Sequence, residues 1–436
     1  MIDATTAPSP VVSTGLRTRG HDRAVALVRT MIAGRTPHAL LISGPPGVGK
    51  TTLALDLAAG LLCDDPNPAA RPCRACRACR LVDRGLHPDL HRIAPSGPAD
   101  QIRIGDRDRP DSGTVRRLSS DLVLLSVEGG ARVAILERAD RLTDDAQTAL
   151  LKTLEEPPSG VTIVLCADDE ERLMPTVRSR CTRIRLGPVA IREIEAILAA
   201  MDVAEPPLAA RLARLASGRP GVARTLALAP DAVAARDEIA RTLLDLLAAG
   251  PAARLAAARD LSARAGDLAR ALDRATGDAS GEAPVGRPRG GRGRTVATSG
   301  RASSSVEPTE PGPSGDDGDD DAAPVASASA ADRRRAVSSV IGIWRDLVRD
   351  LLLVRLGDER QVRDLGLLDD LRAAATRLGT SPDSAEANRM SPANPDAVLA
   401  GFLARLDAVG ELVEANARPE LALDSLLLGW PRTGAE

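Results

Sequence analysis

A glycine-rich stretch near the start of the chain has the residue types and spacing of a phosphate-binding loop. Residues 44–51 read Gly-Pro-Pro-Gly-Val-Gly-Lys-Thr, which fits a glycine, four residues and then Gly-Lys-Thr. The glycines let backbone N–H groups turn toward phosphate oxygens, and a helix beginning near Lys50 adds its positive end. The expected cofactor is ATP or ADP with Mg²⁺, and the alternative is a glycine-rich turn that binds no ligand. The expected binding residues are Gly44, Gly47, Gly49, Lys50 and Thr51.

Four cysteines follow this loop with the spacing of a metal site. They are separated by nine, two and two residues, so the last three form a Cys-x-x-Cys-x-x-Cys run. Four thiolates complete a tetrahedral zinc shell and leave no position for water or substrate, so a structural Zn²⁺ is expected. An iron–sulfur cluster is the first alternative, because cysteines with two-residue gaps also bind such clusters. The expected ligands are Cys63, Cys73, Cys76 and Cys79.

Other histidines and cysteines do not displace this interpretation. His87 and His91 lie close by and are candidates to substitute for a cysteine, but four cysteines already complete the shell. Disulfides are disfavoured because no secretory signal peptide is apparent. In addition, Cys166 and Cys181 lie in segments expected to be a buried strand and a strand end.

Composition narrows the class of protein. A chain of 436 residues with 43% hydrophobic content has room for two or three domains with apolar cores. Its aromatic content of 1% leaves no platform for stacking nucleobases, and its net charge of -3 argues against a protein that coats nucleic acid by itself. No apolar run approaches the roughly 20 residues that span a bilayer. A soluble, cytoplasmic protein is expected.

The elements that must position the loop and the cysteines alternate between strands and helices. An apolar run at 39–42 leads directly into the loop and is predicted to be a buried strand. Such alternation predicts a parallel sheet with helices on both faces and ligands at the carboxyl ends of its strands. Further strands are expected at 89–93, 132–137, 162–166 and 182–186, with helices at 22–32, 115–125 and 143–154.

Beyond residue 188 the pattern becomes helical, with one interruption. Residues 277–331 are dominated by Gly, Pro, Ser, Ala and Asp. Such a segment cannot bury enough apolar surface to offset the entropy lost on ordering, so a disordered insertion is expected there. The helical patterns on either side of it suggest one helical domain that carries this insertion.

The chain as a whole resembles the bacterial clamp-loader subunits of the AAA+ class. The phosphate loop alone is generic, whereas Ala-Leu-Leu-Lys-Thr-Leu-Glu-Glu-Pro-Pro at 149–158 and Ser-Arg-Cys at 179–181 are far more specific at this distance from it. The cysteine spacing, Ala-Asp-Arg-Leu at 139–142 and the tail at 416–423 also carry the resemblance. It covers nearly everything except the first dozen residues and the insertion.

This resemblance implies a domain order. A disordered arm at 1–15 precedes an α/β AAA+ domain at 16–187, which contains the zinc module at 63–79. A helical lid follows, and then an all-α collar domain interrupted by the disordered insertion. The expected bounds are 188–230 for the lid, 231–276 and 332–436 for the collar, and 277–331 for the insertion.

The resemblance also implies roles for two arginines. Arg180, in the Ser-Arg-Cys motif, is implied to act as an arginine finger on the nucleotide bound by a neighbouring subunit, where a planar guanidinium suits a transferring phosphoryl group. The alternative is that Arg180 merely pairs with a surface carboxylate. Arg224 occupies the position of a second nucleotide sensor on the lid.

The chain departs from the family where a strand normally ends in Asp-Glu. Here it ends in Glu137 and Arg138. Glu137 is still a candidate to hold magnesium, but the guanidinium of Arg138 stays protonated and cannot act as a general base. Loss of a general base commonly costs roughly 10²–10⁴-fold in rate. The chain is therefore expected to bind ATP with weak or absent turnover of its own.

The leading hypothesis from the sequence is an adaptor subunit of the clamp loader within the DNA polymerase III holoenzyme, a DNA-directed DNA polymerase complex. The implied partners are the gamma or tau and delta subunits and, through the complex, the sliding clamp and primed DNA. One alternative is an active motor subunit of the gamma or tau type. Another is a nucleotide-binding scaffold unrelated to replication.

Overall fold

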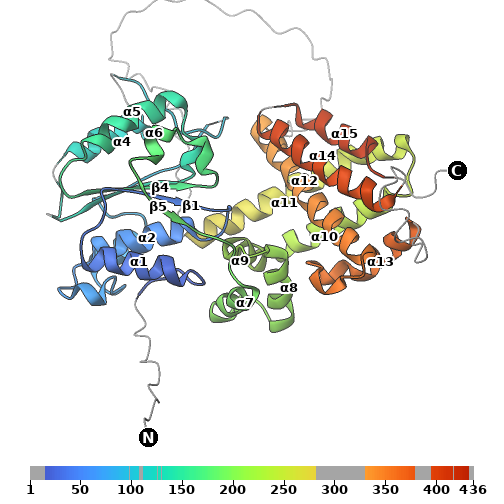
Figure 1. Ribbon diagram of the computed structural model, residues 1–436, viewed down its shortest axis with the longest axis horizontal. Helices are drawn as coiled ribbons and strands as arrows, with labels where there is room; N and C mark the ends of the chain where they lie inside the picture. The colour runs from blue at the N-terminus through green and yellow to red at the C-terminus, as the bar shows by residue number, and fades with distance from the viewer. Residues whose placement is uncertain are drawn as a thin grey trace, which may run out of the picture.

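Three groups of elements make up the structure, a computed structural model of the chain (Figure 1). Residues 1–14 of the expected arm (1–15) and residues 281–328 of the expected insertion (277–331) lie outside the described residues. None of the described helices is long and apolar enough to cross a membrane. The structure describes residues 15–97, 99–107, 111–124, 126–128, 130–280, 329–378, 394–415 and 417–431, with no side-chain description for 276–280.

The first group is a five-stranded sheet in the order β2-β3-β4-β1-β5. Every neighbouring pair is parallel, which confirms the parallel sheet predicted from the apolar runs. Because parallel strands are covered on both faces, they read as continuous apolar runs rather than alternating ones. The strands are β1 (Ala39–Ser43), β2 (Leu90–Ile93), β3 (Arg132–Leu136), β4 (Val161–Ala167) and β5 (Thr182–Arg185).

Helices cover both faces of this sheet and divide its core in two. Successive side chains of a strand point to opposite faces, so Leu40 and Ile42 pack with α1 and α2, whereas Leu41 packs with α4 and α5 on the other face. Both faces of the sheet are therefore buried, and the loops that could bind a ligand lie at the carboxyl ends of the strands. The helices are α1 (Asp22–Ala33), α2 (Lys50–Leu61), α3 (Arg77–Asp83), α4 (Val115–Val123), α5 (Asp144–Glu155) and α6 (Pro175–Arg178).

The remaining helices form two further groups, each with a core of its own. We call α7–α9 the lid, with a core around Leu198 and Leu212, and α10–α15 the collar. In Figure 1 the lid lies at the lower centre, below α11, which runs between the sheet and the rest of the collar. The helices are α7 (Ile191–Ala200), α8 (Pro206–Ala216), α9 (Pro220–Leu228), α10 (Pro230–Asp245), α11 (Pro251–Ser280), α12 (Ala330–Arg355), α13 (Leu368–Arg377), α14 (Pro395–Glu414) and α15 (Pro419–Leu428).

The helices on either side of the expected insertion run further than composition suggested. Residues 277–280 continue α11, and residues 330–331 already belong to α12. At the second boundary the reason is a capping box: the Ser329 hydroxyl accepts a hydrogen bond from the Asp332 N–H at 3.1 Å, and the Asp332 carboxylate accepts one from the Ser329 N–H at 3.2 Å. This reciprocal cap fixes where the helix begins.

A buried group of charges, which we call the charge clasp, joins the lid to the collar. Arg211 of α8 contacts Asp364, in the collar segment after α12, at 3.0 Å, and Asp237 of α10 at 2.7 Å. Arg236 of α10 contacts the second oxygen of Asp364 at 2.5 Å. Asp364 is buried, so its carboxylate depends on these two arginines for compensation.

Breaking the clasp is expected to destabilise the fold. Asp364→Asn should lower the free energy of unfolding by about 3 kcal/mol, because the buried Arg236 then loses its close carboxylate partner, whereas Arg211 keeps Asp237. Asp370→Asn is the matched control: Asp370 pairs with Arg241 on the exposed surface at 3.3 Å, and its loss should cost less than about 1 kcal/mol. Urea titration of both variants measures this, and equal stabilities would show that the clasp contributes nothing special.

Candidate nucleotide site and metal centre

The predicted phosphate loop connects the carboxyl end of β1 to the first turn of α2. Gly44, Gly47 and Gly49 have φ angles of 150°, 79° and 113°, which side-chain-bearing residues rarely adopt. Gly49 caps α2 without any side-chain hydrogen bond to the first turn. The N–H groups at this helix end are therefore available to an anion, as a phosphate site requires.

Lys50 begins α2 and its ammonium group is fully engaged within the chain. Its Nζ donates to the carbonyl oxygens of Gly44 at 2.6 Å and Pro45 at 2.8 Å, and it forms an ion pair with Asp168 Oδ1 at 2.6 Å. The lysine side chain is only 7% exposed. The ammonium group that the motif predicts to face a phosphate is therefore paired with a carboxylate of the same chain.

Sheet register explains why Asp168 reaches the phosphate loop. Strands β1 and β4 are neighbours, with Ser43 opposite Ala167, and the Gly44 N–H donates to the Ala167 carbonyl at 3.2 Å. The residue that follows each strand therefore emerges at the same edge. Asp168 is not among the residues predicted from the sequence, although it directly follows an apolar strand, as Glu137 does.

The two residues after β3 are both engaged in ion pairs. Glu137, the predicted magnesium ligand, accepts hydrogen bonds from Arg92 of β2 at 2.9 and 2.6 Å. Arg138 contacts Asp100 at 2.8 Å, and its Nε lies 4.0 Å from Asp168 Oδ2. Asp168 thus faces two cations, Lys50 on one oxygen and Arg138 on the other, while Glu137 faces away toward the edge strand.

The lid touches the phosphate loop through the first turn of α9. The Gly221 N–H donates to the Gly47 carbonyl at 2.8 Å, and a Cβ added at Gly47 would lie 2.9 Å from a methyl group of Val222. Further along the same helix, the Nε of Arg224 is buried without a hydrogen-bond partner among the described residues. The structure therefore brings the lid helix that carries Arg224 against the loop predicted to bind nucleotide.

Arg180 lies at the opposite end of the sheet from this loop. It precedes β5, whose first residue Thr182 pairs with Leu40 near the amino end of β1, whereas the phosphate loop follows the carboxyl end of β1. Its guanidinium contacts Glu155 of α5 at 2.5 Å and donates to the Thr176 carbonyl at 2.9 Å. Arg180 is therefore not part of this chain's own phosphate site.

The four predicted zinc ligands converge on one point. Their sulfur atoms all lie within 4.8 Å of one another, and the Cys63 and Cys76 sulfurs are 3.9 Å apart. Zinc–sulfur bonds of about 2.3 Å in a tetrahedron place sulfurs roughly 3.8 Å apart. The N–H groups of Cys73, Cys76 and Cys79 donate to sulfurs of the cluster at 3.3–3.4 Å. All six cysteines of the chain are free of disulfides.

The histidines near the cluster have other roles. His87 is buried and accepts a hydrogen bond from the Asp89 N–H at 3.1 Å through Nδ1. Its Nε2 is 3.3 Å from Glu128 but is not aligned for a hydrogen bond. Burial lowers the pKa of His91, which lies on β2 and belongs to the sheet. Neither histidine belongs to the group of sulfurs that lie close together.

The thiols of the cluster differ in electrostatic environment. Burial raises the pKa of Cys63 and of Cys79. Backbone N–H groups of Ala75 and Cys76 lower the pKa of Cys73 to about 7. The cluster therefore combines two enclosed sulfurs with one that backbone dipoles already favour as a thiolate.

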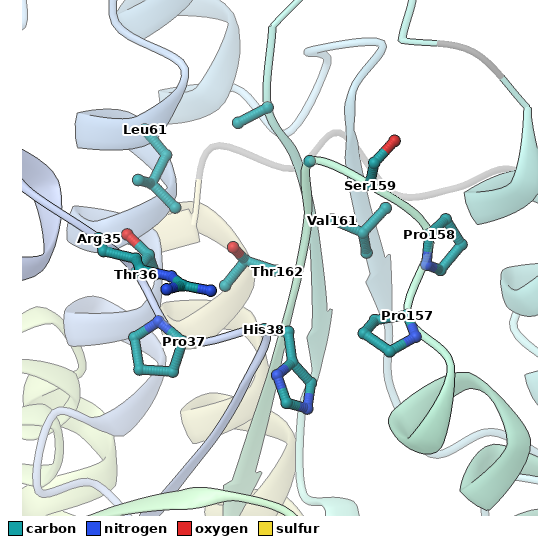
Figure 2. A pocket seen from close by; sticks show the side chains of 12 residues that line it. Arg35, Thr36, Pro37, His38, Leu61, Pro157, Pro158, Ser159, Val161 and Thr162 are labelled. Carbon is teal, nitrogen blue, oxygen red and sulfur yellow. The ribbon is translucent and has the colours of Figure 1, made fainter.

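A cavity of about 670 Å³ opens at the amino ends of β1 and β4, far from the phosphate loop along the strands (Figure 2). Arg35, Thr36 and His38 line one side, and the turn at 157–160 lines the other. In the close-up the Arg35 guanidinium points toward Thr162. The phosphate site is defined by backbone conformation and charge, and this cavity does not coincide with it.

Comparison with known proteins gives matches that cover the sheet, the loop and the cysteines. Residues 21–190 match the model of a family described as DNA polymerase III, delta subunit. The chain is 35% identical to DNA polymerase III subunit delta' of Escherichia coli over 201 residues, which is 46% of this chain and 57% of that protein. It is 36% identical to subunit delta' of Pseudomonas aeruginosa over 156 residues, 35% of this chain and 45% of that protein. The chain thus spans about half the length of these relatives.

A third relative and one solved structure widen the comparison. Subunit tau of Escherichia coli is 33% identical over 217 residues, 49% of this chain and 32% of that protein. A gamma subunit-related protein of DNA polymerase III from Thermotoga maritima superposes with a TM-score of 0.39 at 15% identity, over 93% of this chain and 97% of that one. A TM-score below 0.5 establishes no common fold, so the similarity to DNA polymerase III subunits rests on the sequence matches.

Proposed function

We propose that this chain belongs to the delta-prime family of DNA polymerase III clamp-loader subunits and acts as an adaptor subunit of the clamp loader in DNA replication, a proposal supported by the match of residues 21–190 and by the similarity to the delta' subunits. In this role it binds ATP or ADP with Mg²⁺, associates with the gamma or tau and delta subunits, and helps load the sliding clamp on primed DNA. Its place of action is the cytoplasm.

The observation that carries the adaptor role is Arg138 at the carboxyl end of β3. A motor subunit needs a carboxylate here to position the attacking water, whereas this chain places a guanidinium within an ion pair to Asp100 at 2.8 Å. A protonated guanidinium cannot accept a proton from water. The phosphate loop nevertheless keeps its glycine geometry and Lys50. Nucleotide binding without efficient turnover follows from this combination.

Four further assignments belong to the proposal. The four converging sulfurs hold a structural zinc ion, because a closed set of four thiolates leaves no open position. Arg180 serves the nucleotide of a neighbouring subunit, and its place at the amino ends of the strands supports action in trans. Arg224 senses nucleotide from the lid, which its unpartnered buried Nε supports, and Glu137 contributes to Mg²⁺ binding after exchanging its partner Arg92.

The second candidate function is an active motor of the gamma or tau type. The match to subunit tau of Escherichia coli and the complete phosphate loop favour it. Turnover by the isolated chain separates the two candidates. Pull-down of the tagged full chain from its native lysate tests membership of the complex: gamma or tau and delta subunits are the expected proteins, and their absence would contradict the clamp-loader role.

Nucleotide binding without turnover gives a direct prediction. Full-length protein should bind MgATP or MgADP in calorimetry, while steady-state hydrolysis stays negligible. Lys50→Ala should weaken binding by about 100-fold or more, because the lysine supplies the charge that faces the β/γ-phosphates. Arg35→Ala is the control, since Arg35 lies at the other end of the sheet. Robust turnover by a preparation free of other ATPases would replace the adaptor role with the motor role.

A further inference from the structure

The carboxylate of Asp168 forms an ion pair with the Lys50 ammonium, which a nucleotide phosphate must contact in order to bind. Lys50 Nζ donates hydrogen bonds to Gly44 O at 2.6 Å and Pro45 O at 2.8 Å, and it forms an ion pair with Asp168 Oδ1 at 2.6 Å. Two of these three partners are neutral carbonyls of the loop itself. Asp168 is the charged one, and it compensates the buried ammonium as long as no phosphate is present.

A phosphate entering the loop meets this carboxylate as a like charge. Asp168 is fixed at the site by its backbone, because its N–H donates to Asp140 Oδ1 at 2.8 Å. Its side chain is 26% exposed, so the repulsion is only partly screened. The carboxylate must therefore leave Lys50 for the phosphate to replace it.

Arg138 offers the carboxylate a second partner. Its Nε lies 4.0 Å from Asp168 Oδ2, at the outer limit of an ion pair, so a change of side-chain rotamer is enough to shorten this contact while the Lys50 contact lengthens. Arg138 is itself held by Asp100 on the loop beyond β2. Each of the two cations thus faces a different oxygen of one carboxylate.

We propose that Asp168 is a built-in competitor of nucleotide phosphate, which occupies Lys50 in the empty site and transfers to Arg138 when ATP or ADP binds. This inference rests on the proposed nucleotide binding and specifies what limits it. Asp168 acts as a specificity-determining residue that weakens binding, and Arg138 acts as a positioning residue that works through Asp168. Arg138 stands where a motor subunit has its general base, and by accepting Asp168 it leaves Lys50 free to bind a phosphate.

The test is calorimetric titration of the full chain with MgADP and MgATP. Asp168→Asn should tighten binding by about tenfold, which corresponds to about 1.4 kcal/mol. Asp169→Asn is the matched control, because Asp169 loses the same charge one residue away but bonds within its own turn, to the Glu171 N–H at 2.9 Å. Asp168→Ser repeats the test with a smaller neutral side chain, and thermal melts verify that each variant is folded.

A double-mutant cycle separates the role of Arg138 from direct phosphate contact. Arg138→Ala should weaken MgADP binding several-fold in the wild-type background and have no effect in the Asp168→Asn background, because the competitor is then gone. An effect of the same size in both backgrounds would overturn the transfer to Arg138.

The outcomes for Asp168 and for nucleotide binding are distinguishable. If wild type and both Asp168 variants bind with equal affinity, the competitor role is wrong and nucleotide binding stands. If none of them binds MgADP or MgATP, nucleotide binding itself is wrong and the competitor role goes with it. Tighter binding by the Asp168 variants but not by Asp169→Asn supports both.

Discussion

Purified protein is expected to contain about one zinc ion per chain, and Cys76→Ser is expected to lose it together with about 5 kcal/mol or more of folding stability. The basis is that structural zinc contributes about 10–16 kcal/mol of apparent free energy in small zinc domains. Here the cluster has sulfurs positioned within 4.8 Å of one another. Elemental analysis and denaturant titration of the wild type and the variant measure both effects.

The expected loss of stability is large because an arginine of the cysteine segment pairs with a buried carboxylate of helix α2. Arg74, which lies between two of the cysteines, forms ion pairs with Asp56 of α2 and with Asp83 of α3. Asp56 is buried and also accepts hydrogen bonds from the N–H groups of Arg17 and Thr18 at 2.8–3.0 Å. Without the metal, Arg74 loses its fixed position and Asp56 loses its charged partner.

The control for this prediction is Cys181→Ser. Cys181 is not one of the four sulfurs that lie close together, so the Cys181→Ser variant should retain zinc and most of the folding stability. Burial raises the pKa of the Cys181 thiol to about 11. Nucleotide affinity of whatever Cys76→Ser protein folds should change far less than its stability. Purified wild-type protein without zinc, or with iron and visible charge-transfer absorption, would end the zinc assignment.

Arg180→Ala is expected to depress the DNA- and clamp-stimulated ATPase of the reconstituted clamp loader while leaving this chain folded. An arginine finger in trans contributes about 10³–10⁵ in rate in the GTPases where it is best measured. The effect on the whole complex should be smaller, because other subunit interfaces keep their own fingers. Arg180→Lys should restore little, since an ammonium does not reproduce the planar fork.

The ion pair between Arg180 and Glu155 supplies the decisive control. If Arg180 serves only to pair with Glu155 of α5 at 2.5 Å, then Glu155→Gln and Arg180→Ala should have equal effects on the complex. If Arg180 acts on a neighbour's nucleotide, Glu155→Gln should leave ATPase activity near the wild-type level, because the arginine is retained. Normal clamp loading by the Arg180→Ala complex would reduce Arg180 to a surface ion-pair residue.

Local patterns in the sequence were enough to predict the sheet and the two clusters of chemistry. The phosphate loop and the Cys-x-x-Cys-x-x-Cys run are short, so the chain itself sets the distances within them. The strands are buried on both faces and can therefore be recognised in the sequence as apolar runs. The end of the expected insertion was less accurate, because a capping box at Ser329 starts α12 earlier than composition indicates.

Contacts between residues that are far apart in the chain could not be predicted from the sequence. Nothing in the composition indicates that Trp344, Phe402 and Trp430, all the aromatic residues of the chain, meet in the collar with ring centroids 4.8–5.2 Å apart. The charge clasp is similar, since Arg211 and Asp364 are 153 residues apart. Long-range pairs depend on how helices pack, and helical periodicity specifies only which face is buried.

The sequence by itself therefore determined which groups are candidates to bind phosphate and metal, because backbone conformation and short spacing are fixed locally. Only the tertiary structure decided what those groups contact within the chain. Parallel register between β1 and β4 places Asp168 on Lys50, the edge strand places Arg92 on Glu137, and the lid places Gly221 on Gly47. Each of these contacts joins segments that are neighbours only after folding, so no local pattern in the sequence indicates them.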